Sequence, residues 1–143
     1  MSEQTELLNF VYQNARMGET TLPLVIGMVS RPDLRRALSA QFVEYHAIAD
    51  EAKQAIERQG RRAKEPDALK GAMAETMLHL NTLTDRSPRH VAEMMVRGST
   101  MGTVQMSKRL HACRYTAGKE AADLAGRLLK TEENNIEQMK AFL

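Results

Sequence analysis

The stretch AADLAGRLLKTEENNIEQMKAF, residues 121–142, decides the fold class of this chain. At alternating intervals of three and four residues it carries Ala121, Ala125, Leu128, Glu132, Asn135, Met139 and Phe142. This spacing places these side chains on one face of an α-helix, as in the buried seam of a helix bundle. Most of the face is apolar, so the polar Glu132 and Asn135 need an explanation.

The same spacing recurs along the chain and predicts helices near 4–29, 32–59, 66–84, 88–113 and 118–142. Ser87 and Pro88 form a helix start, because serine is a good N-cap and proline a good first helical residue. The turns near 30–33 and 114–118 are short, so the helices on either side of each should pair as antiparallel hairpins. The sequence therefore predicts an all-α fold. We expect one domain over 1–143, an antiparallel four-helix bundle with an extra helical crossover, 66–84, between two hairpins.

Composition agrees with this fold class and narrows the function classes. Aromatic residues are 4% of the chain and hydrophobic residues 43%, which favours helices over sheets. A net charge of +2 is too balanced to predict nucleic-acid binding. The polar N-terminus is unlike a signal peptide, and no apolar run approaches the roughly 20 residues of a membrane span. With a single cysteine, Cys113, the sequence predicts a cytoplasmic protein without membrane or nucleic-acid partners.

Three glutamates carry the functional question. Glu19 and Glu132 occupy seam positions that should be apolar, and a buried carboxylate must be paired, protonated or bound to a metal. In an antiparallel hairpin, residues at equal distances from the turn lie at the same level. By this rule Glu19 lies about one helical turn from the level of Glu44, and Glu132 lies level with about residue 100. We therefore expect Glu19, Glu44 and Glu132 to share one layer at mid-bundle, with Glu19 and Glu132 facing the interior.

Two stretches, AEMMVRGSTMG at 92–102 and LKTEENNIE at 129–137, together with the two hairpins and the crossover, resemble a group of small bacterial ferritin-like proteins. The resemblance implies the ferritin-like bundle. It also implies a site for two irons, in which one helix of each hairpin gives a Glu and the other a Glu-x-x-His.

This sequence departs from that ligand pattern at three positions. Ala47 stands three residues after Glu44, and Asn135 three residues after Glu132, where the pattern requires histidine. No carboxylate lies near Met101, at the level where a bridging glutamate belongs. The resemblance thus implies the fold more strongly than the di-iron chemistry, and we expect no bound cofactor and no stoichiometric iron.

Two readings of the glutamates follow. In the first, they form a structural polar network with Asn135, Tyr12 and Tyr45, and the chain is a non-enzymatic structural or interaction bundle, with a homodimer formed through an exposed apolar helix face. In the second, Glu19, Glu44 and Glu132 hold iron or another divalent metal, and the chain is a metal-binding protein or oxidase with an unusual carboxylate-rich site.

A run of methionines in 88–113 is open to two similar interpretations. Its members are Met94, Met95, Met101 and Met106. Thioethers are soft ligands that could hold copper(I). Methionine at helical spacing is more often core filler or an adaptable contact surface, so we predict core positions here.

Overall fold

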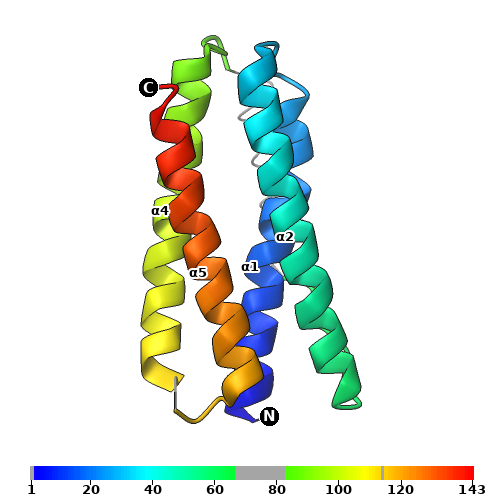
Figure 1. The fold of residues 1–143 in the computed structure, drawn as a ribbon. Helices are drawn as coiled ribbons and strands as arrows, with labels where there is room; N and C mark the ends of the chain where they lie inside the picture. The colour runs from blue at the N-terminus through cyan, green and yellow to red at the C-terminus, as the bar shows by residue number, and fades with distance from the viewer. Residues whose placement is uncertain (1, 67–82, 114) are drawn as a thin grey trace.

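Four long helices stand side by side in the computed structural model, which describes residues 2–66, 83–113 and 115–143 (Figure 1). They are α1 (Glu3–Ile26), α2 (Pro32–Arg58), α4 (Pro88–Cys113) and α5 (Lys119–Lys140). The described residues contain no strand, so the all-α prediction is confirmed. The predicted helix at 66–84 falls almost entirely outside the described residues. None of the four described helices has the length and apolarity that crossing a membrane requires.

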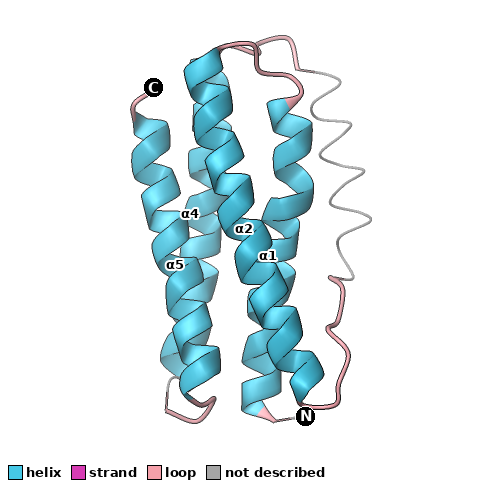
Figure 2. Cartoon of the chain, turned by 45° about the vertical axis from the view of Figure 1, so that its right-hand side comes forward, coloured by secondary structure: helices cyan, strands magenta, loops and turns pink. Residues whose placement is uncertain are grey.

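The helices form two antiparallel hairpins, as predicted from the short turns. α1 pairs with α2, and α4 pairs with α5 (Figures 1 and 2). α2 ends at the end of the bundle opposite to the one where α4 begins, so α2 and α4 run in the same direction (Figure 1). The bundle is not evenly packed. Contact is extensive within each hairpin, and α5 packs on both α1 and α2, whereas the contact between α1 and α4 is thinner than any of these.

Local sequence signals set the helix ends. Ser2 Oγ accepts a hydrogen bond from the backbone N–H of Thr5 at 3.2 Å, and Ser87 Oγ accepts one from the N–H of His90 at 3.3 Å. Each bond satisfies an N–H that has no partner within its helix, which confirms the cap predicted at Ser87. After α1, the Arg35 guanidinium donates to the carbonyl oxygens of two residues at the turn, at 2.8 and 2.7 Å. That cation stabilises the carbonyl end of α1.

The predicted seams lie in the core with few exceptions. On α5 every predicted position is buried except Phe142, which packs partly buried against the core. On α4 the outcome is mixed: Met106 is buried, Met94 and Met95 are half-buried, and Met101 is 65% exposed. The core prediction is therefore wrong for Met101, because α4 stands off from α1 along this stretch and nothing described covers that side of the helix.

Candidate functional site

A groove of about 690 Å³ runs between α1 and α4, where the two helices make little contact. Its apolar walls include Met17, Leu22 and Val25 from α1 and Met94, Met95 and Met101 from α4. The volume lies within the roughly 300–1,000 Å³ typical of small-ligand sites. A hollow of this kind, lined by flexible side chains, is suited to binding an apolar group.

Tyr45, Ser99 and Glu132 supply polar groups to this groove. The Tyr45 hydroxyl donates to Glu132 Oε2 at 2.7 Å and accepts a hydrogen bond from Asn135 Nδ2 at 3.2 Å. Ser99 is a further hydrogen-bonding neighbour of the carboxyl group, and it acts to lower the pKa of Glu132. The predicted polar network therefore exists around Glu132, Tyr45 and Asn135. Ser99, which sequence reasoning did not single out, is its additional member.

Burial dominates the electrostatics of this network. Glu132 is only 7% exposed, and loss of hydration raises the pKa of its carboxyl group, although hydrogen bonds from Tyr45 and Ser99 act in the opposite direction. The pKa of Tyr45 is also raised, first by burial and then by the neighbouring Glu132 charge. The phenol therefore stays protonated and keeps donating to the carboxylate.

Two glycines leave the space that Tyr45 and Glu132 of this network occupy. A Cβ at Gly18 of α1 would lie 2.7–2.8 Å from three ring atoms of Tyr45, so the ring packs directly on the α1 backbone. A Cβ at Gly102 of α4 would lie 2.8 Å from Glu132 Oε1. Real Cβ atoms essentially never approach other atoms so closely. Both positions thus require glycine for the observed arrangement.

Glu19 lies in different surroundings from Glu132. It is on α1 with its side chain 19% exposed, paired with Arg16 at 2.9 Å and with His46 Nδ1 at 3.4 Å. Tyr12, which was expected in the same network, instead donates to Glu65 at 2.5 Å, and burial together with that carboxylate raises the pKa of Tyr12 to about 12. The prediction of an interior Glu19 is thus only partly met, since its partners, Arg16 and His46, lie beside the α1–α2 interface.

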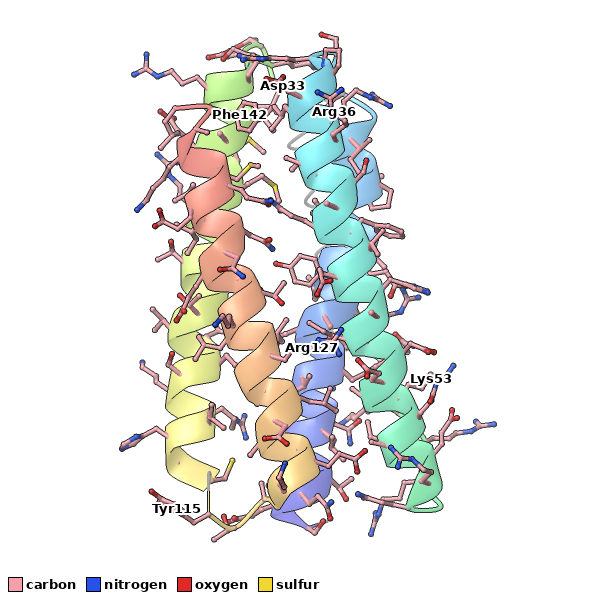
Figure 3. The ribbon with its side chains drawn as sticks, viewed as in Figure 1. Asp33, Arg36, Lys53, Tyr115, Arg127 and Phe142 are labelled. Atoms are coloured by element: carbon pink, nitrogen blue, oxygen red, sulfur yellow. The ribbon has the colours of Figure 1, made fainter. Side chains whose placement is uncertain are left out.

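Glu44 lies on the outer side of α2. Its side chain is 53% exposed, and its charged neighbour is Arg127 of α5 at 4.0 Å. Arg127 reaches from α5 toward α2 and also bonds Glu51 (Figure 3). Successive residues of a helix point about 100° apart. Glu44 therefore points away from the interior that the next residue, Tyr45, occupies.

The structure does not bring the three predicted carboxylates together. Gly18 and Tyr45 are in contact, so Glu19 and Glu44 do stand at nearly the level of Glu132, as the hairpin count indicated. The prediction of one shared layer is right in height. Glu132 faces the interior as predicted, Glu19 does so only in part, and Glu44 points outward. Sequence position along a hairpin gives height with good accuracy, whereas an error of one residue in register rotates a side chain by about 100°.

The donor set around Glu132 does not fit two irons. Its neighbours are a phenol, a hydroxyl and an amide. No group of three His, Cys, Asp or Glu side chains able to hold a metal occurs among residues 2–66, 83–113 and 115–143. A di-iron centre needs several carboxylates and imidazoles within bonding distance of the metals.

We therefore predict that the protein purified without chelators contains far less than one iron per chain. Elemental analysis of the purified protein, after growth with added iron, measures this directly. A stoichiometry near two irons per chain would contradict the prediction and would require carboxylate or histidine ligands other than those around Glu132.

Comparison with known proteins adds evidence on the fold. No protein-family model matches this chain, and no curated protein matches it. A solved structure from Rhodopseudomonas palustris, YcfI, described as "a putative structural protein", matches with a TM-score of 0.77 at 12% sequence identity, covering 98% of this chain and 94% of its own. The likeness is one of fold. It supports the helical bundle, whereas membership of the ferritin-like superfamily stays a prediction.

Proposed function

We propose that this protein is a non-enzymatic binding bundle of the ferritin-like type, which acts by holding an apolar partner in the groove between α1 and α4. The observation that carries the proposal is the groove itself, about 690 Å³ in volume and walled by Met17, Met94, Met95 and Met101. Methionine side chains are flexible and polarisable, so they adapt to irregular apolar surfaces.

The polar groups described above favour binding over catalysis. Among the described residues that line the groove, Tyr45 and Glu132 are the titratable ones, and the two are bonded to each other. A nucleophile–base pair or a metal cluster would be expected for an enzyme of this architecture. The structural role suggested for YcfI is compatible with a binding bundle, although that protein resembles this chain in fold alone.

The two alternatives from the sequence have unequal support. A carboxylate-rich metal site would need Glu19 and Glu44 beside Glu132, whereas both are engaged with Arg16 and Arg127 respectively. A homodimer has a suitable surface, because Met101 and Val104 are large apolar residues exposed on α4. Self-association through α4 would bury that exposed apolar area and is compatible with a binding role for this helix.

Titration with the neutral fluorescent dye Nile red tests the proposal. We expect saturable binding of about one dye per chain, and at least a tenfold loss of affinity in the Gly98→Phe variant. A Cβ at Gly98 meets no atom of the described residues within 4 Å, so a phenylalanine there can fill the groove without an overlap with them at its Cβ.

Val43→Phe is the matched control, because Val43 is an exposed apolar residue on α2, outside the groove. This variant should bind the dye as the native protein does. Absence of saturable binding, or an equal loss of affinity in both variants, would show that the groove is not the binding site.

A further inference from the structure

We propose that the groove between α1 and α4 binds a small amphiphilic organic cation, an alkyl ammonium whose chain lies among the methionines and whose charged nitrogen bonds Glu132. The inference rests on the proposed function, since it names the class of ligand that the groove would take. Three features of the described residues support it: the charge of the lining, the orientation of the carboxyl group and the neutrality of its other neighbours.

The first feature is the charge of the groove. Glu132 is the one acidic residue among the described residues that line the groove, and none of them is lysine, arginine or histidine. An apolar hollow with one buried carboxylate attracts a cation and disfavours an anion, because charge interactions are strong where water is largely excluded. A neutral apolar ligand would be bound in the groove only through burial of its apolar surface.

The second feature is the orientation of the carboxyl group. Oε2 is held by the Tyr45 hydroxyl at 2.7 Å, which fixes the direction of the group. The other oxygen, Oε1, faces Gly102, and a Cβ at Gly102 would lie 2.8 Å from it. Glu132 and Gly102 both line the groove. Glycine at this position therefore keeps a side chain of residue 102 from covering Oε1, which lies close to the α4 backbone. An ammonium group in the groove can donate a hydrogen bond to this oxygen.

The third feature is that each helix presents uncharged groups to Glu132. These are Gly18 on α1, Tyr45 on α2, Ser99 and Gly102 on α4, and Asn135 on α5. Burial without a neighbouring cation favours the protonated carboxyl group. Binding of an ammonium supplies the missing positive charge and favours the ionised form, so a protonated Glu132 carboxyl group releases its proton to solvent as the cation binds. Affinity for the cation should consequently rise with pH until the amine itself loses its proton.

Calorimetric titration of the full chain with three ligands of equal chain length, n-octylammonium chloride, 1-octanol and sodium octanoate, tests the inference. All three are used below the concentration at which they aggregate. On the native protein we expect octylammonium to bind about tenfold or more tightly than octanol, the effect of one hydrogen bond between charged groups, and octanoate to bind most weakly. In Glu132→Gln, octylammonium should bind no more tightly than octanol, with octanol little changed. The exposed carboxylate of Glu133 on the same helix provides the control, and Glu133→Gln should retain the preference.

The outcomes separate the inference from the proposed function. If octanol binds but octylammonium is not preferred on the native protein, or if Glu132→Gln keeps the preference, the cation inference is wrong while the groove remains a binding site. If neither octanol nor octylammonium binds and Nile red does not bind either, the proposed function fails and the inference fails with it. Because the comparison of three ligands on the native protein needs no variant, the inference stays testable even if Glu132→Gln does not fold.

Discussion

Gly18→Ala is expected to lower the free energy of unfolding by about 1–3 kcal/mol, which is the usual effect of forcing an extra group into a packed interior. The added methyl group would lie 2.7–2.8 Å from three ring atoms of Tyr45. The ring cannot easily retreat, because its hydroxyl is bonded to Glu132 and Asn135 on the far side. α1 and α2 must therefore separate, or the phenol must leave the network. Urea unfolding followed by circular dichroism measures the change.

Gly126→Ala is the matched control for this experiment. Gly126 lies within α5, and a Cβ there meets no atom within 4 Å. Alanine is more favourable than glycine in a helix interior by about 0.5–1 kcal/mol, so this variant should be more stable than the native protein. Stabilisation of both variants alike would contradict the close packing of Tyr45 on the α1 backbone.

Glu132→Gln should change how stability depends on pH. Burial raises the pKa of Glu132 in the folded protein above its ordinary value of 4.5, so the folded chain keeps a proton that the unfolded chain releases. The stability contributed by this group is therefore fully present below the ordinary value and is lost as pH rises through the raised, folded-state pKa. Glutamine removes this dependence, yet its side-chain oxygen can still accept the hydrogen bond from Tyr45.

We expect the stability of Glu132→Gln relative to the native protein to increase as pH rises from about 4 to about 8. The total increase should be about 1.4 kcal/mol for each pH unit by which the pKa is raised. Urea unfolding across this range gives the difference, and the exposed Glu133→Gln serves as the control that should show little pH effect relative to native. A difference that is constant with pH would mean that Glu132 titrates at its ordinary value when folded.

Periodicity predicted the helices well, and the chemistry of the site less well. The predicted seam of α5 is buried at Leu128, Glu132, Asn135 and Met139, because a three–four repeat determines which face of a helix is covered. Ser87 likewise carried a cap signal that the structure confirms. These features depend on local sequence, so one chain is sufficient to predict them.

The remaining features depend on contacts between helices. Ser99 joins the network and Gly18 makes room for Tyr45, yet neither position has a signal in its own helix, because their roles come from residues far away in sequence. Met101 was expected in the core on the strength of its spacing. Spacing alone does not reveal that α4 stands away from α1 at this level.

Tyr45 links all four described helices, and this limits how the two hairpins could be exchanged in evolution or design. Its ring rests on Gly18 of α1, and its hydroxyl engages Glu132 of α5 and, through hydrogen bonding, Ser99 of α4. A hairpin transplanted from a related bundle could bring the correct apolar surface. It would still fit poorly if it lacked the residues that this hairpin contributes to the contacts of Tyr45. The two halves of the molecule are therefore not independent modules, since each carries residues that are useful only in the presence of the other.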